Sequence, residues 1–488
     1  MPRIILFALV LFFSQSFGLE NVRCGTSRFA ENLKNPKKKM LAKAGCTPES
    51  YDGEVKFRDT KNKSFRIYYM ETGPHAIRTN EYIDSLASYL EQAYKMHKNN
   101  GMKGISGAQR THHYRQSVPA GLYPIEVIDA GLLRGYEEDE DGFAQTFGLT
   151  FPGGIEIIIE NDFAYGADCS GNLSKFHFKG SQGVDYYEEW KLILKATVFH
   201  ELYHAFQSAY YNWQRYETFW LEASATGVEE IGVPDADDYI NYLQYNFRNP
   251  GVSMEIIESN SFEAYGWATL YLFLYSQMGS RFDSAIWNYF SNPEYSKDSF
   301  GMQLARLADS LNKNAEDLFH EYARQIFYSG TRAKSSPYRL FWGDMPNWPN
   351  WRVNTSVPSV LQPGTFDFIR TENELNTASV ARKSYIKDGN NIVWVLSRLL
   401  EKEYVTPEDL ARGTVAYPNP WNPRNSKTPA IHFKNLPKDS KGIEIRSANG
   451  ALIARVDSLW EPKKIPAPGI LYYRDLPYGK NKVLIVQY

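Results

Sequence analysis

The chain has 488 residues, of which 43% are hydrophobic and 23% are charged. This composition is typical of globular proteins and excludes fibrous repeats and extensive disorder. The 54 Lys and Arg residues against 56 Asp and Glu residues give a net charge of −2, so no basic excess indicates binding to nucleic acid or to anionic lipid.

The N-terminus has the pattern of a secretory signal peptide. Arg3 supplies a positive start, residues 4–13 form an uninterrupted apolar run, and the small residues Ser16 and Gly18 follow. The run is shorter than the roughly 20 residues that a membrane-spanning helix needs. We therefore predict a signal peptide over residues 1–18, a secreted or cell-surface protein, and no transmembrane anchor.

Residues 19–60 are polar and interrupted by proline and glycine, which predicts an N-terminal arm or a propeptide-like segment. The arm contains Cys24 and Cys46, which form the natural disulfide pair of an exported protein and leave Cys169 as a free or buried thiol. The absence of a Cys-x-x-Cys spacing argues against a zinc site built from thiolates.

Residues 61–341 are expected to form one α+β domain, with a short mixed sheet, an active-site helix and a helical C-terminal subdomain. Short apolar runs predict strands at residues 65–69, 123–129 and 155–160. Apolar residues at helical spacing predict helices at residues 80–98, 187–210, 264–278, 302–311 and 315–328.

A segment rich in proline and tryptophan, residues 342–349, indicates a boundary after the helices. Short apolar alternations with turn signals such as Asn449-Gly450 follow it. We predict a linker and intermediate β region over residues 342–415 and a β-sandwich over residues 416–488.

The predicted helix 187–210 contains the sequence His200-Glu201-Leu202-Tyr203-His204, an H-E-x-x-H motif. Residues four apart lie on one face of a helix, about 6 Å apart, so the two imidazoles can reach one zinc ion. The glutamate between them then lies beside the metal, where it can take a proton from a water molecule. The alternative is a buried helix whose two histidines only satisfy each other in a core.

A catalytic zinc ion needs a third protein ligand, and Glu222 on the next predicted helix is the candidate. The small residues 223–225 after it permit close packing against the first helix. Thr226 and Glu229 lie on the same helical face, where they can support a ligating histidine or simply face solvent.

These residues resemble the gluzincin class of zinc peptidases, in which an H-E-x-x-H pair is completed by a distant helical glutamate. Trp220 and the series Glu222, Ala225 and Glu229 resemble the W-x-x-E-x-x-A-x-x-x-E motif of the aminopeptidases, with one residue fewer after the tryptophan. Their G-x-M-E-N strand is absent. The chain is also similar, over about residues 60–330, to exported bacterial metalloprotease-like proteins with H-E-x-x-H-x-x-Q, which here ends at Gln207. The resemblance implies Zn2+ as cofactor and protein or peptide substrates.

Tyr265-Gly266 resembles the tyrosine with which such enzymes stabilise the oxyanion of the tetrahedral intermediate. Its alternative is an ordinary core tyrosine, since Tyr271 and Tyr275 follow on the same helix. The strand 155–159 is expected either to be the edge strand that pairs with an extended substrate or to be a buried central strand.

Three other groups of polar residues are weaker candidates. The acidic segment 137–142 suggests calcium, but its ligand spacing is incomplete and a solvated loop is the simpler interpretation. His112, His113 and His177 have no partner at metal-binding spacing and are expected to be ordinary polar residues.

The tail that begins with Tyr417-Pro418-Asn419-Pro420 resembles the C-terminal sorting domain of the type IX secretion system, an immunoglobulin-like sandwich. This resemblance implies the outer-membrane secretion machinery as a partner. A generic accessory β-domain is the alternative.

The sequence therefore predicts a secreted zinc metallopeptidase, most consistent with an endopeptidase. His200, His204 and Glu222 are its expected zinc ligands, Glu201 its general base, and Tyr265 its oxyanion donor. Two alternatives remain: a cell-surface binding or adhesion protein with a structural zinc site, and a hydrolase that acts on something other than peptides. Glu201 favours an enzyme, because a structural zinc site needs no carboxylate between its ligands.

Overall fold

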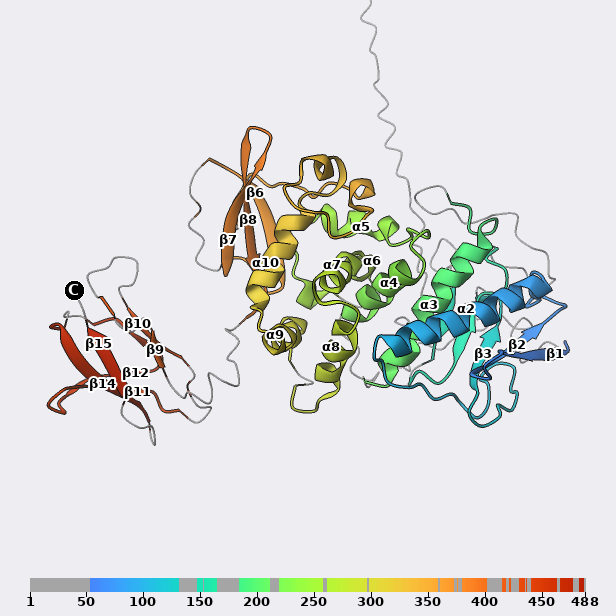
Figure 1. The fold of residues 1–488 in the computed structure, drawn as a ribbon, viewed down its shortest axis with the longest axis horizontal. Coiled ribbons are helices and arrows are strands. Elements are labelled where there is room, and N and C mark those ends of the chain that lie inside the picture. The colour runs from blue at the N-terminus through green and yellow to red at the C-terminus, as the bar shows by residue number, and fades with distance from the viewer. Residues whose placement is uncertain are drawn as a thin grey trace, which may run out of the picture. The chain divides into compact units, whose positions relative to one another are not determined.

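The computed structural model divides the chain into two compact units with the boundary between Glu401 and Lys402 (Figure 1). It describes residues 53–130, 147–151, 153–164, 184–210, 219–257, 261–295, 298–358, 360–372, 375, 380–401, 415–417, 421–422, 430–434, 436, 440–462, 466–476 and 482–486. Several predicted features lie outside the described residues: the signal peptide 1–18, most of the arm 19–60, the three cysteines, the segment 137–142 and His177.

The first unit begins with a five-stranded sheet in the order β1-β2-β3-β5-β4. Its strands are β1 (Val55–Asp59), β2 (Phe65–Met70), β3 (Tyr123–Val127), β4 (Gly148–Thr150) and β5 (Ile157–Ile159). β2, β3 and β5 are parallel, and β1 and β4 add to them as antiparallel strands. Every residue of β3 and β5 is buried, as expected for parallel strands covered on both faces.

Of the two positions expected for residues 155–159, an edge strand or a buried central strand, the structure has the central one. β5 lies between β3 and β4, and the last described strand on that side is β4. Ile157, Ile158 and Ile159 are apolar on both faces of the strand, so both faces need cover, which only an interior position provides. The three residues of β4 are too few to produce a recognisable alternation in the sequence.

Helices α2 (Asn80–Asn99) and α3 (Trp190–Ser208) contact each other and pack on the same sheet. Thr79 begins α2 as an N-cap, with its side chain accepting a hydrogen bond from the Tyr82 N–H. In α3 nearly every residue is buried, which is typical of a helix that is enclosed by protein on all sides. The H-E-x-x-H motif therefore lies in the interior of the unit.

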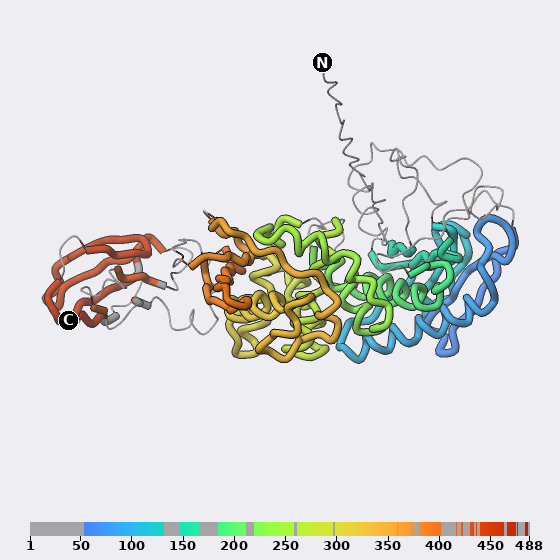
Figure 2. Tube along the Cα trace, turned by 90° about the horizontal axis from the view of Figure 1, so that it is seen from above, coloured from blue at the N-terminus to red at the C-terminus, as the bar shows by residue number. Residues whose placement is uncertain are grey.

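The remaining helices of the first unit follow α3 in the chain. They are α4 (Trp220–Gly232), α5 (Ile240–Phe247), α6 (Phe262–Gly266), α7 (Ala268–Met278), α8 (Phe282–Ser291), α9 (Phe300–Ser310) and α10 (Ala315–Ile326), with short 3-10 turns at Met254–Ile256, Gly330–Ser335 and Met345–Asn347. The predicted helix 264–278 is interrupted at Trp267, which separates α6 from α7. Figure 2 shows the sheet, in blue to cyan, at one end of this unit and these helices, in green to yellow, beyond it.

A second sheet of the first unit has the order β6-β8-β7, with β6 (Thr365–Arg370), β7 (Arg382–Asp388) and β8 (Asn391–Arg398). Its strands pair antiparallel, and α10 packs on β8 and β7. These strands belong to the predicted intermediate β region, and the compact first unit extends past them to Glu401.

The second unit consists of two small antiparallel sheets. Their strands are β9 (Val415–Tyr417), β10 (Ile431–Lys434), β11 (Ile443–Ser447), β12 (Leu452–Val456), β13 (Leu459–Trp460), β14 (Gly469–Asp475) and β15 (Lys482–Val486). The orders are β13-β10-β9 and β12-β11-β14-β15, and side chains of both sheets share one hydrophobic core that includes Trp421, Phe433 and Ile445. The chain thus has a mixed α+β fold, as predicted. None of the helices in the described part of the chain has the length and hydrophobicity to cross a bilayer.

Glu444 is the one charged residue of β11 whose side chain is almost completely buried, with 1% exposed, and three arginines surround it. Arg455 and Arg474 each reach its carboxylate at 2.8 Å, and Arg446 reaches it at 3.0 Å. Hydrogen bonds from Arg455, and then from Arg474 and Arg446, lower the pKa of Glu444 from 4.5 to about 2. This cluster links β11 to β12 and β14.

We expect Glu444→Gln to lower the thermal unfolding temperature of the second unit at pH 7. Because the pKa of Glu444 is depressed in the folded state, the ionised carboxylate stabilises this unit above about pH 4.5 and loses that effect as the pH falls toward 2. The difference between the variant and the unmodified protein should therefore shrink over this range. Calorimetry of the full chain tests this, with the exposed Glu461→Gln as control. An equal difference at pH 7 and pH 3 would contradict the assignment.

Candidate metal centre

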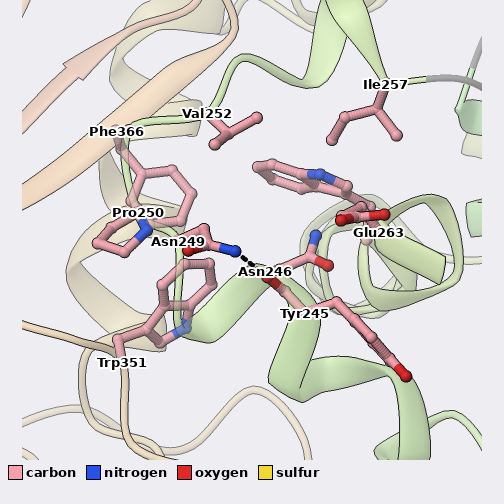
Figure 3. A pocket seen from close by; sticks show the side chains of 11 residues that line it. Tyr245, Asn246, Asn249, Pro250, Val252, Ile257, Glu263, Trp351 and Phe366 are labelled. Atoms are coloured by element: carbon pink, nitrogen blue, oxygen red, sulfur yellow. Dashed lines mark hydrogen bonds between the residues drawn. The ribbon is translucent and has the colours of Figure 1, made fainter. Parts of the chain in front are cut away.

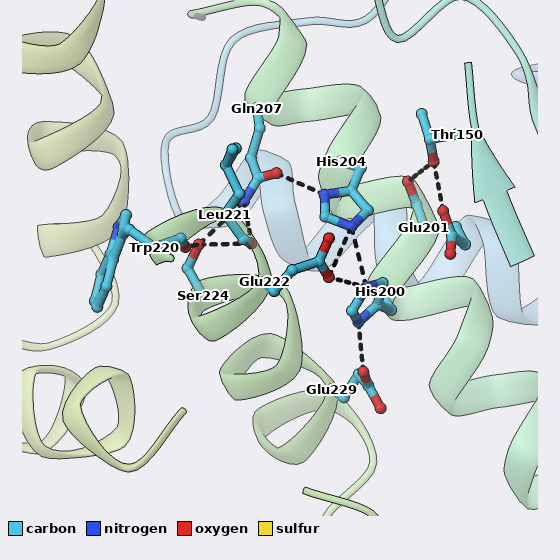
Figure 4. A network of polar contacts seen from close by, with 10 residues as sticks. All are labelled: Thr150, His200, Glu201, His204, Gln207, Trp220, Leu221, Glu222, Ser224 and Glu229. Atoms are coloured by element: carbon cyan, nitrogen blue, oxygen red, sulfur yellow. Dashed lines mark hydrogen bonds and ion pairs between the residues drawn. The ribbon is translucent and has the colours of Figure 1, made fainter. Parts of the chain in front are cut away.

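Two packed helices bring together the three predicted zinc ligands. His200 and His204 lie on one face of α3, and Glu222 lies in the first turn of α4. The Nε2 atoms of the histidines are 3.0 Å apart, and Glu222 Oε2 is 3.2 Å from His200 Nε2 and 3.5 Å from His204 Nε2. All three side chains are buried, and Figure 4 shows them pointing toward one another.

The triangle formed by these atoms has the size that a tetrahedral zinc site requires. Ligand atoms at 2.0–2.1 Å from a tetrahedral ion are about 3.3 Å apart. The three separations, 3.0, 3.2 and 3.5 Å, bracket this value. Two imidazole nitrogens and one carboxylate oxygen also match the ligands of catalytic zinc, which leave a fourth position open.

The side chain of Gln207 fixes the tautomer of His204. The Gln207 amide nitrogen donates to the Leu221 carbonyl oxygen and to Ser224 Oγ, both at 3.0 Å. Because a carbonyl oxygen can only accept, the amide orientation is determined, and Gln207 Oε1 faces His204 Nδ1 at 2.7 Å. His204 Nδ1 must then carry the proton, which leaves a lone pair on Nε2.

Glu229 fixes His200 in the same way. Its Oε1 lies 2.5 Å from His200 Nδ1, and a carboxylate accepts a hydrogen bond from the ring N–H. The His200 lone pair is therefore also on Nε2. Two nitrogen lone pairs and a carboxylate oxygen therefore converge in a buried space. These electron-rich groups repel one another unless a cation lies between them.

The environment of Glu222 shows that its ionised form depends on nearby positive charge. Complete burial raises the pKa of its carboxyl, and positive charge on His204 and His200 would lower it below its ordinary value. With both rings neutral, as their hydrogen bonds require, a bound cation would supply that charge and hold the carboxyl group in the ionised form that binds a metal.

Glu201 lies beside the histidine pair and faces the sheet. Its carboxylate accepts a hydrogen bond from Thr150 Oγ1 at 2.8 Å, and the same hydroxyl lies 2.7 Å from the Glu201 carbonyl oxygen. Figure 4 shows Thr150 and Glu201 together, next to β4. Gly148 of the same strand is also close, since a Cβ atom added there would lie 2.4 Å from Glu201 Cγ. The last strand of the sheet therefore positions the predicted general base.

Tyr265 on α6 lies against the candidate metal ligands. Its ring is stacked on the His200 ring with centroids 6.2 Å apart and an interplanar angle of 11°. The next residue, Gly266, has no room for a side chain, because a Cβ atom there would lie 2.3 Å from Asn246 Oδ1. The Tyr265-Gly266 pair therefore allows α6 to approach α5 closely.

The structure brings some of the predicted residues into this site and leaves others apart. The Thr226 hydroxyl is buried and makes no hydrogen bond within the described part of the chain, so only Glu229 of that predicted pair contacts a ligand. His112 and His113 donate their backbone N–H groups to Glu156 and Glu126 elsewhere in the unit.

Sequence reasoning missed two contributions. The role of Gln207 could have been inferred, because it lies three residues after His204 on the same helical face. Thr150 is far from the motif in sequence, and no local signal links it to Glu201.

A small pocket of about 50 Å³ lies between α5, α6 and the segments that contain Trp351 and Phe366 (Figure 3). Glu263 and Trp267, on either side of Tyr265 in the chain, both line it, and Trp351 and Phe366 complete an aromatic wall. A pocket of this size is far smaller than the usual ligand site and is too small to indicate a substrate.

Comparisons of this chain with protein-family models, with curated proteins and with solved structures found no match. The interpretation of the site therefore rests on the geometry of its own residues.

If Gln207 fixes His204 for metal binding, then Gln207→Ala should weaken zinc binding by about 10- to 100-fold, the usual effect of removing a hydrogen-bond partner of a ligand. Competition with a chromophoric zinc chelator measures this affinity. Gln277→Ala, at an exposed position on α7, is the matched control and should bind zinc like the unmodified protein. Equal zinc affinity of Gln207→Ala and the control would show that the amide has no such role.

Proposed function

We propose that this protein is a secreted zinc metallopeptidase of the zincin type. His200, His204 and Glu222 are its zinc ligands. The observation that carries the proposal is the convergence of two imidazole lone pairs and one carboxylate oxygen at separations of 3.0, 3.2 and 3.5 Å. Hydrogen bonds at the opposite ring nitrogens fix both tautomers for that purpose.

The position of Glu201 favours catalysis over a purely structural metal site. It lies between the two histidines in sequence, and Thr150 and Gly148 of β4 restrict its side chain from the other side. A structural zinc site closes its fourth position with another ligand, whereas only three ligand groups meet here among the described residues. A buried carboxylate on the same helix as the two histidines can instead serve in proton transfer.

In this proposal the metal, Glu201 and Tyr265 each have a separate role in peptide hydrolysis. Zinc held at this site supplies a Lewis acid that polarises the scissile carbonyl and activates water at neutral pH. Glu201 accepts the proton of the attacking water and delivers it to the leaving amine. Tyr265 donates a hydrogen bond to the developing oxyanion, and its stacking on the His200 ring supports this role.

The arrangement of the sheet supports an extended peptide as the substrate. β4 is the last described strand on its side of the sheet and lies next to Glu201. A peptide that pairs with such an edge is held by main-chain hydrogen bonds, which do not depend on its sequence. We therefore propose an endopeptidase, with specificity from side-chain pockets.

For the second unit we propose an immunoglobulin-like sorting domain of the type IX secretion kind. Two antiparallel sheets around one core support this proposal, together with the Tyr417-Pro418-Asn419-Pro420 opening and the predicted signal peptide. The partner in this proposal is the outer-membrane export machinery.

The proposal predicts that Glu201→Gln abolishes cleavage of a protein substrate but keeps the zinc. Removing a general base typically costs 10²–10⁴-fold in rate, and the amide is close in size to the carboxylate, so the fold should persist. Casein hydrolysis and the zinc content of the purified protein measure both effects. Glu188→Gln, at an exposed position before α3, is the control and should remain active.

Two outcomes of that experiment would contradict the proposal. Zinc-loaded protein in which neither form cleaves peptides would favour a binding or adhesion role. Equal activity of Glu201→Gln and the unmodified protein would exclude the assigned mechanism.

Gly148→Ala provides an independent test of the position of Glu201. The added methyl group would overlap Glu201 Cγ at 2.4 Å, so the carboxylate must move while the zinc ligands stay in place. We expect activity to fall at least tenfold, in line with the large effect of displaced catalytic groups, with zinc affinity unchanged. Gly104→Ala is the control, because no atom lies within 4 Å of its added Cβ. Full activity of Gly148→Ala would argue against this contact.

A further inference from the structure

A second group of carboxylates lies at the other end of α4. Glu230 belongs to the last turns of that helix, Asp237 lies in the following turn, and Asp344 comes from the segment before Met345–Asn347. One carboxylate oxygen from each of the three lies within 4.8 Å of the others. Three segments of the first unit therefore meet at one point through acidic side chains.

Two oxygen atoms of this group are buried and have no hydrogen-bond partner among the residues that the structure describes. The side chain of Glu230 is 1% exposed, and its Oε1 accepts a hydrogen bond of 2.9 Å from the indole N–H of Trp342. Within the described part of the chain, its Oε2 makes no hydrogen bond, and the same holds for Asp237 Oδ1. A buried polar atom without a partner destabilises the fold, so native proteins rarely leave one unsatisfied.

No positively charged side chain among the described residues balances these carboxylates. Within the described residues, none of the three forms an ion pair with lysine, arginine or histidine. Burial, and then Asp344 and Asp237, raise the pKa of Glu230 to about 9 although Trp342 opposes this, and burial with Asp344 and Asp235 also raises the pKa of Asp237. Either a proton or a cation must therefore neutralise the group at neutral pH.

The chemistry of the group selects the kind of cation. Its donors are all oxygens, which favour hard cations such as Ca2+ over zinc. The three ligand atoms lie within 4.8 Å of one another, close enough for one cation to contact all three. Calcium accepts carboxylates in a flexible geometry, whereas magnesium demands near-ideal octahedral geometry, so carboxylates from three separate segments suit calcium better.

We propose that Glu230, Asp237 and Asp344 form a calcium-binding site. The ion gives the unpaired oxygens of Glu230 and Asp237 a partner, and Trp342 holds Glu230 in place through its other oxygen. It also joins the end of α4 to the segment that contains Asp344. This site stands independently of the proposed peptidase activity, because none of its ligands belongs to the zinc centre.

The site is connected to the metal centre through one helix. Glu230 directly follows Glu229, which holds the His200 ring. Calcium at the end of α4 therefore restrains the segment that orients a zinc ligand. If both sites are as proposed, removal of calcium weakens zinc binding as well as lowering stability.

The test uses the full chain, loaded with zinc and freed of calcium by passage over a chelating resin. Titration with Ca2+, followed by isothermal calorimetry and by thermal unfolding, should show one saturable site and a rise in the unfolding temperature. Tb3+ is a second probe, because Trp342 lies close enough to sensitise its luminescence, and added Ca2+ should displace it.

Asp344→Asn is the informative variant. Asp344 is partly exposed, so replacing its carboxylate with an amide of similar size should not disturb core packing. It should fold, by its circular dichroism, and lower calcium affinity at least tenfold, since affinity depends on the number of charged ligands. Asp309→Asn on α9 is the matched control and should bind Ca2+ normally.

Two results would overturn the proposal. One is the absence of calcium binding up to about 10 mM, above the weak range of extracellular calcium modules. The other is equal calcium affinity of Asp344→Asn and Asp309→Asn. Failure of peptidase assays would leave the calcium result unaffected, so the two proposals are tested separately.

Discussion

The candidate centre depends on a single electrostatic constraint: two imidazole lone pairs and a carboxylate oxygen face each other in a buried space. The tautomers follow from hydrogen bonds on the far side of each ring, where Glu229 holds His200 and Gln207 holds His204. Without a cation this arrangement would be repulsive, and its separations match those around tetrahedral zinc. Nearly every residue of helix α3 is buried, and this packing holds the two histidines in place on one helical face.

Helix α4 carries most of the functional proposals. Glu222 in its first turn faces the histidines, Glu229 two turns later supports His200, and Glu230 points to the acidic cluster with Asp237 and Asp344. One helix thus links a nitrogen-rich centre that suits zinc to an oxygen-only cluster that suits calcium. If both proposals hold, the two sites differ in ligand chemistry and would each favour a different metal.

The sequence was informative where a pattern is local. Helical spacing and the H-E-x-x-H motif predicted α2, α3 and the positions of the histidines, and the structure has both helices within a few residues of the expected ends. Glu222 was a candidate because α3 and α4 are neighbours in the chain. By contrast, β4 has only three residues and gives no recognisable pattern, so the sequence left open whether residues 155–159 form an edge strand or a central strand. The contact between Thr150 and Glu201, and the meeting of Asp344 with Glu230, join distant segments, and only the fold reveals them.

The most direct test of the account is a crystal structure of the zinc-loaded protein with diffraction data on both sides of the zinc absorption edge. We expect one anomalous peak, present only above the edge, within about 2.0–2.2 Å of His200 Nε2, His204 Nε2 and a Glu222 oxygen. A zinc peak elsewhere, or histidine rings at this position hydrogen-bonded to each other with no metal despite excess zinc, would contradict it.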